Sequence, residues 1–124
     1  MVLLTENEKK FYDVLYEIIN KDDILIQTQV VLYDIIETKI KNDYSSFNKI
    51  KSKSIDYVLV NKNFEILLCI ELDDNTHKKS ERIERDNFVN KIFEETDIKL
   101  LRVAVEQNYD TENLRKIINS YLYD

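Results

Sequence analysis

Three carboxylates and the only histidine of the chain follow directly on an apolar run, in the stretch CIELDDNTH from Cys69 to His77. Buried carboxylates are costly unless a proton, a cation or hydrogen bonds compensate their charge. The cluster is therefore either a solvated turn or a functional site. As a site it would suit a hard divalent cation with oxygen ligands, and Mg²⁺ needs few protein carboxylates.

A fourth acid stands in the preceding apolar run, where Asp56 lies within IDYVLV. Side chains alternate along a strand, so Glu71 and Asp73 share one face. If the two strands are antiparallel neighbours, Asp56 and Glu71 lie toward the same end of the pair, because Asp56 is near the start of its strand and Glu71 is near the end of its own. We expect their carboxylates within about 8 Å of each other, close enough to share Mg²⁺ or Mn²⁺, with Asp73 as a possible third ligand.

The elements that position these residues can be predicted from periodicity. We expect a helix over 5–20, a β-rich run over 24–32, a polar stretch to residue 54, strands over 55–60 and 64–72, a helix over 78–96, a strand over 99–105 and a closing helix over 111–122. The turn between the two middle strands is Asn-Lys-Asn, and Asn tolerates positive φ. The order α-β-β-β-α-β-α predicts one α/β domain over 1–124, a mixed sheet flanked by helices.

Composition excludes several classes of protein. Apolar residues make up 44% and charged residues 34%, which is typical of a folded globular domain rather than a disordered one. No apolar run approaches the ~18 residues of a membrane span, and the N-terminus does not resemble a secretory signal. A single cysteine excludes an internal disulfide, so we expect a reducing cytoplasm and no disulfide-linked partner. The chain has no glycine, so it holds no glycine-rich phosphate loop.

The charge is unevenly distributed along the chain. The formal net charge is −6, yet the segment 39–53 contains five lysines and one acid, so it carries +4 and the remainder −10. Such a run is usually a solvated face. The alternative is a patch that contacts nucleic-acid phosphates through Lys49, Lys51 and Lys53.

Several motifs together resemble a known superfamily. They are LTENEKKFYDVL, QVVLYDII, SIDYVLV, IELDDNTH, ERIERDNF and LLRV, and they span residues 4–105. The chain resembles the PD-(D/E)XK, restriction-endonuclease-like superfamily, and more narrowly an uncharacterised nuclease-like family related to very-short-patch-repair endonucleases. The resemblance implies a restriction-endonuclease-like α-β-β-β-α-β core and cleavage of phosphodiester bonds by a metal-activated water, with Asp56 and Glu71 at the metal positions.

Asp73 departs from that pattern, because the superfamily has a lysine two residues after the second acid. In the short-patch-repair branch, which also lacks this lysine, a histidine takes part in the chemistry. His77 fits that role, since its ordinary pKa of ~6.5 allows proton transfer near neutrality. The alternative for His77 is a solvated residue at the start of a helix.

Two charged residues on the expected helices have two interpretations each. Glu8 completes a capping box with Thr5, or it enters the site as an additional acid, which the resemblance supports. Arg85 shares a stripe with Val89 and Ile92, so its guanidinium should point toward the sheet. There it would pair with an acid or contact the scissile phosphate.

Four further polar residues have simpler interpretations. Asp86 should pair with a surface base, and Lys78 and Arg82 are further candidates for contacts with nucleic acid. Gln29 resembles a polar position of the family, or it is an exposed strand residue.

The leading hypothesis is a Mg²⁺- or Mn²⁺-dependent endonuclease acting on DNA. The alternative is a catalytically inactive module of the same fold that binds nucleic acid or a protein partner, including a second copy of the chain. A third possibility is an acidic protein whose surface charge engages a basic partner.

Overall fold

The computed structural model describes residues 1–40, 53–74 and 80–123. The helices are α1 (Glu6–Ile18), α2 (Leu32–Ile40), α4 (Ser80–Glu94) and α5 (Thr111–Leu122), and the strands are β1 (Leu25–Val31), β2 (Ser54–Val60), β3 (Ile66–Asp73) and β4 (Leu100–Ala104). The strands form one sheet in the order β1-β2-β3-β4. The pairs β1–β2 and β2–β3 are antiparallel and β3–β4 is parallel, so the sheet is mixed, as predicted.

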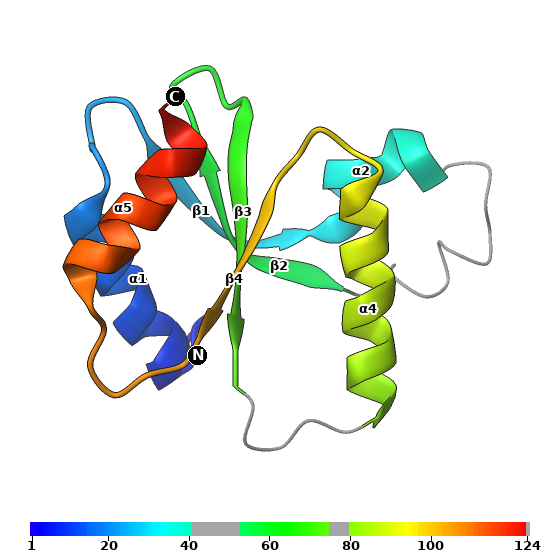
Figure 1. Cartoon of the computed structure of the whole chain (residues 1–124), viewed down its shortest axis with the longest axis horizontal. Helices are drawn as coiled ribbons and strands as arrows, with labels where there is room; N and C mark the ends of the chain where they lie inside the picture. The colour runs from blue at the N-terminus through cyan, green and yellow to red at the C-terminus, as the bar shows by residue number, and fades with distance from the viewer. Residues whose placement is uncertain (41–52, 75–79, 124) are drawn as a thin grey trace.

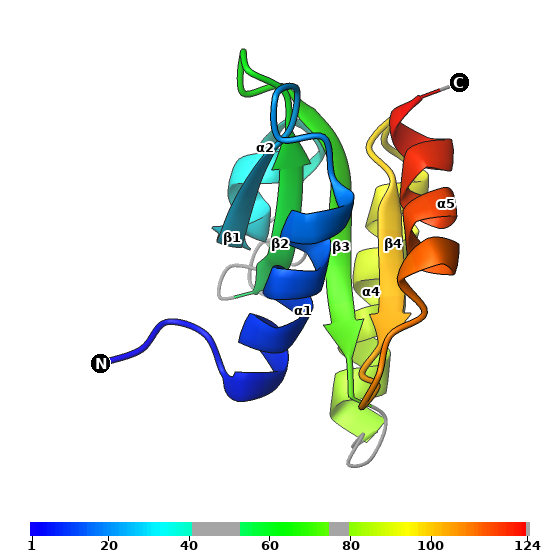
Figure 2. The ribbon, with the colours of Figure 1, turned by 90° about the vertical axis from the view of Figure 1, so that its left-hand side faces the viewer.

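Helices cover both faces of this sheet. Figure 1 shows α1 and α5 on one side and α2 and α4 on the other, and Figure 2 shows the strands in their order from β1 to β4. Each face has its own core. On one face, Phe11 and Leu15 of α1 are buried in a cluster with Tyr57 and Leu68 of the sheet. On the other, Val89 of α4 is buried in a cluster with Val58 and Cys69 of the sheet. The α/β class, the flanking helices and the closing helix over Thr111–Leu122 are confirmed.

The predicted element order is wrong at one place, because α2 follows β1 directly and the order is α-β-α-β-β-α-β-α in the described residues. We expected a polar stretch there. Leu32 and Ile36 are 0% and 1% exposed and pack in the core beneath α4. These two apolar residues one turn apart suffice to anchor a short helix, although Ile36 itself has non-helical backbone angles.

Two local predictions have different outcomes. The capping box of α1 is confirmed, since the Thr5 side chain accepts from the Glu8 amide and the Glu8 carboxylate accepts from the Thr5 amide. In the β2–β3 turn, however, the residue with positive φ is Phe64, at 62°, and not an asparagine. Asn61 contributes through its side chain instead, because its Oδ1 accepts hydrogen bonds from two backbone amides of the turn.

Candidate functional site

The two acids of the predicted pair meet across the β2–β3 ladder. Tyr57 pairs with Ile70 and Val58 with Cys69, so the register places Asp56 opposite Glu71. The Leu72 amide donates to Asp56 Oδ2 at 2.8 Å, and the Asp56 amide lies 3.4 Å from Glu71 Oε2. The prediction of neighbouring antiparallel strands is therefore confirmed. Because Val58 and Cys69 lie beneath α4, alternation puts both acids on that face of the sheet.

Glu71 is the most deeply buried acid of the site, at 3% exposure. The pKa of its carboxyl group is raised from 4.5 to about 8, first by burial and then by the hydrogen bond and negative charge of Asp56, while Lys53 opposes the shift. At neutral pH this carboxyl group can hold a proton, and a nearby divalent cation would favour its ionised form.

A lysine faces this acid from the residue before β2. Lys53 Nζ lies 3.1 Å from Glu71 Oε1, and the two side chains are 19% and 4% exposed. Their geometry is not that of a hydrogen bond, so Oε1 is a buried oxygen without a hydrogen-bond partner although it has a charge partner. From the sequence, Lys53 belonged to a run that is either a solvated face or a phosphate-contacting patch. The structure places it beside the acids; Lys49 and Lys51 lie outside the described residues.

Asp73 is not joined to the acid pair; an arginine that sequence reasoning missed holds it. Arg102 Nη1 donates to Asp73 Oδ1 at 3.1 Å, and its Nε donates to Asn90 Oδ1 at 2.9 Å. Its Nη2 lies 3.9 Å from Asp86 Oδ1. One signal was available, because Arg102 is the single charged residue inside the apolar β4 sequence LLRVA. An arginine in such a strand requires a buried acid nearby.

The predicted orientation of α4 is wrong by one residue. Arg85 is exposed, whereas Asp86 is 7% exposed and faces the sheet. The buried side of the helix follows Asp86, Val89 and Phe93, at helical spacing. Asp86 has a partner that the prediction missed, because the guanidinium of Arg102 approaches it from β4.

Glu8 connects the start of α1 to the sheet. Besides its capping bond to Thr5, its Oε2 accepts a hydrogen bond from Gln29 Nε2 at 3.1 Å. The other end of the Gln29 amide accepts from Ser54 Oγ at 3.1 Å, and Gln29 has a left-handed backbone with φ of 53°. Glu8 thus contacts a chain of polar groups that ends next to Lys53. It does not line the cavity between the acids, and Gln29 is half-buried rather than exposed.

A cavity of about 40 Å³ lies among the acids of β2 and β3. It is lined by Lys53, Asp56, Glu71, Leu72, Asp73, Asp74, Arg82, Asp86 and Arg102. Five acids against three cations leave it with a formal charge of −2 when all are ionised. A water molecule occupies about 30 Å³ in the liquid, so the cavity suits a small ion rather than an organic ligand. Arg82 belongs to this lining, as a predicted nucleic-acid contact; His77 and Lys78 lie outside the described residues.

Asp56 and Glu71 fit a hard cation by two criteria: Oε1 of Glu71 is a buried oxygen without a hydrogen-bond partner, beside the charge of Lys53, and Mg²⁺ uses only one or two carboxylates together with water. Within the described residues no set of three or more His, Cys, Asp or Glu side chains is arranged to hold a metal. The reason is visible in the contacts of Asp73, whose carboxylate is directed to Arg102.

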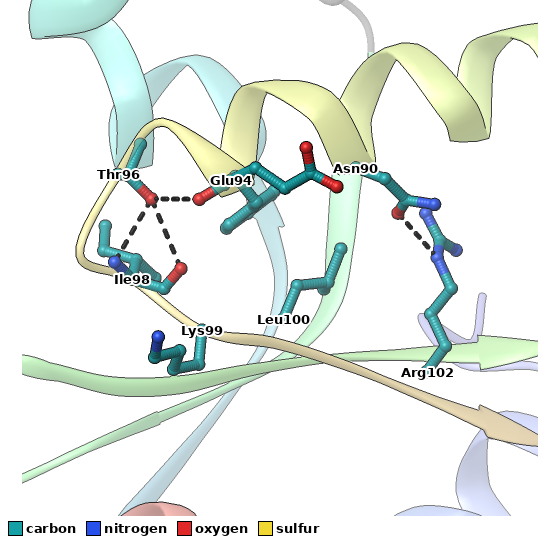
Figure 3. A pocket seen from close by; sticks show the side chains of 8 residues that line it. Asn90, Glu94, Thr96, Ile98, Lys99, Leu100 and Arg102 are labelled. Atoms are coloured by element: carbon teal, nitrogen blue, oxygen red, sulfur yellow. Dashed lines mark hydrogen bonds between the residues drawn. The ribbon is translucent and has the colours of Figure 1, made fainter.

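A larger cavity of about 420 Å³ lies beside Arg102, between the end of α4 and β4. Figure 3 shows Asn90 reaching Arg102 at one end of it, and Thr96 hydrogen-bonded to Ile98 at the other. Arg102 lines both cavities. A change at this arginine would therefore affect both.

A protein family described as a protein of unknown function, DUF2726, matches residues 1–121. The chain belongs to the DUF2726 family. No curated protein and no solved structure matches this DUF2726 chain. Among the described residues of this family member, no helix has the length and apolar character needed to cross a membrane.

Proposed function

We propose that this DUF2726 chain is a divalent-metal-dependent nuclease that hydrolyses phosphodiester bonds of DNA, with a restriction-endonuclease-like fold. The observation that carries the proposal is the acid pair on β2 and β3, where Asp56 and Glu71 face one another beside an ammonium group. This combination of two carboxylates and a lysine has the chemical types that the resemblance implies, although the lysine comes from the residue before β2.

Asp56 and Glu71 would hold the cation, and Mg²⁺ or Mn²⁺ would supply a more acidic water and positive charge near the phosphate. The chain's own groups then have separate tasks. Asp56 is kept in place by the Leu72 amide, which donates a hydrogen bond to its Oδ2. Lys53 and Arg82 bring cationic donors to the cavity, where they can bind phosphate oxygens. His77 remains the candidate for transferring a proton to or from the reacting groups.

Asp73 has a supporting role in this proposal. Its carboxylate balances Arg102 and fixes the end of β3, with the Val105 amide bonded to the Asp73 carbonyl oxygen at 2.8 Å. The strand end that carries Glu71 is thereby held to β4. Because Arg102 also approaches Asp86, the contact connects the sheet to α4.

A cleavage assay on single- and double-stranded DNA, with Mg²⁺ or Mn²⁺ and with EDTA, tests the proposal. Cleavage should need the metal, and Asp56→Asn and Glu71→Gln should each lower it by ~10²-fold or more. The exposed Glu17→Gln is the matched control and should cleave like the wild type. Metal-dependent cleavage that survives both site substitutions would assign the activity to other residues.

A specific observation favours the second candidate, an inactive module of this fold that binds nucleic acid or a protein partner. The cations of the site already compensate acids within the chain, since Lys53 faces Glu71 and Arg102 binds Asp73. A site of that kind is stable without a metal. DNA binding without cleavage in either metal would support this alternative.

A further inference from the structure

The Lys53–Glu71 ion pair occupies the place where a cation would have to bind. Nζ lies 3.1 Å from Oε1, and this oxygen has no hydrogen-bond donor although it is buried. The second acid, Asp56, lies beside the same carboxylate, with its amide 3.4 Å from Oε2. Oε1 is therefore the oxygen of Glu71 that faces a positive charge in the protein itself.

We propose that Lys53 is a displaceable counter-ion, which pairs with the carboxylate form of Glu71 while the site holds no metal and leaves Oε1 when a divalent cation binds. The reason is electrostatic. An ammonium group and a divalent ion within about 4 Å of one another repel strongly in a site that excludes most water. Both cannot lie against one carboxylate oxygen. The inference rests on the proposed metal site and adds that metal and lysine compete for it.

The backbone around Lys53 is anchored, so only its side chain has to move. The Lys53 carbonyl oxygen accepts a hydrogen bond from the Leu32 amide at 2.9 Å. The next residue, Ser54, donates to Gln29, which is itself held by Glu8. A lysine side chain is a flexible stem with a single charged end, and it can turn without disturbing these bonds. The cavity is also lined by Lys53, so the released ammonium would stay near it and could meet an anionic ligand.

Metal affinity measured by isothermal titration with Mg²⁺ and Ca²⁺ at pH 8.5 tests the displacement without using catalysis. Lys53→Met removes the competing charge and keeps much of the apolar stem, so its Kd should be roughly tenfold lower than that of the wild type, or lower still. Lys53→Gln should change the affinity in the same direction. Lys62→Met removes an exposed lysine in the β2–β3 turn and should leave the Kd unchanged.

The outcomes separate this inference from the proposed function. If the wild type binds metal and Lys53→Met binds it equally or more weakly, the counter-ion role is overturned while the metal site stands. If only the Lys53 variants bind metal, the lysine blocks the site without leaving it, and the displacement is overturned while the metal ligands stand. If none binds, the metal site and the inference both fail. A wild-type sample with labelled lysine Cε carbons gives the same answer without substitution: the Lys53 signal should shift on titration with Mg²⁺, and a constant signal during saturable binding would refute the idea.

Discussion

The buried carboxyl group of Glu71 should make the stability of the metal-free protein fall as the pH rises. The native pKa is about 8, against 4.5 for an ordinary glutamate. Below pH 4.5 the native and the unfolded protein both hold the proton, so the raised pKa does not lower the free energy of unfolding. Between pH 4.5 and 8 the unfolded chain releases its proton while the native chain keeps it, so the free energy of unfolding decreases across this window. The pKa difference corresponds to about 5 kcal/mol at most, out of the 5–15 kcal/mol typical of a domain.

Glu71→Gln isolates this effect, because glutamine resembles the protonated carboxyl group and does not titrate. Urea denaturation followed by circular dichroism, in EDTA at pH 4.5, 7 and 9, gives the free energy of unfolding of both proteins. The free energy of unfolding of the variant, relative to that of the wild type, should increase by several kcal/mol between pH 4.5 and pH 9. The exposed Glu17→Gln should show no such gain over this range. A difference between wild type and Glu71→Gln that stays constant from pH 4.5 to 9 would refute the argument that burial controls this acid.

Three further predictions follow from other contacts. Arg102→Met removes the cation that binds Asp73 and approaches Asp86, and should lower the free energy of unfolding by ~2–4 kcal/mol in urea denaturation. Arg102→Lys should restore only part of it, and an unchanged midpoint would contradict the network. Burial raises the pKa of the Cys69 thiol to about 12, so a disulfide reagent should modify it slowly in the native protein and quickly in urea, and rapid native labelling would argue against its burial. If the lysine-rich segment contacts phosphates, replacing Lys49 and Lys51 with Gln should lower the salt dependence of DNA binding by ~0.9 in log–log slope per lost contact, whereas an unchanged slope would leave the segment a solvated one.

The parts of the fold that could be predicted from the sequence are those with a strong local pattern. The capping box of α1, the β2–β3 pair and the span of α5 were all readable, because their apolar spacing is regular and their ends are polar. Helix α2 was not, since its anchoring residues Leu32 and Ile36 continue an apolar run that began in β1. A run of that kind does not show where a strand ends and a helix begins.

The site was predictable where it depends on strands next to each other in sequence. Strand order and alternation bring Asp56 to Glu71, and both can be derived from the chain. The positions of Arg102 and Asp86 depend on a parallel strand and on the rotation of α4. Successive residues of a helix point about 100° apart, so a small error in the predicted rotation exchanges the exposed and buried positions of Arg85 and Asp86. The pairing of Lys53 with Glu71 could not be predicted, because Lys53 also belongs to the lysine-rich segment 39–53.

The parallel pairing of β3 with β4 has a consequence for the order of folding. Lys53, Asp56 and Glu71 come from a single hairpin, and hairpins form in about 1–10 μs. Arg102 arrives only after the chain has crossed the sheet through α4, and such long-range contacts form more slowly. We expect the acid pair to meet while Lys53 is the cation of the hairpin that lies next to Glu71. The lysine thus shields the forming strands from charge repulsion during the early steps, before β4 docks and Arg102 reaches Asp73.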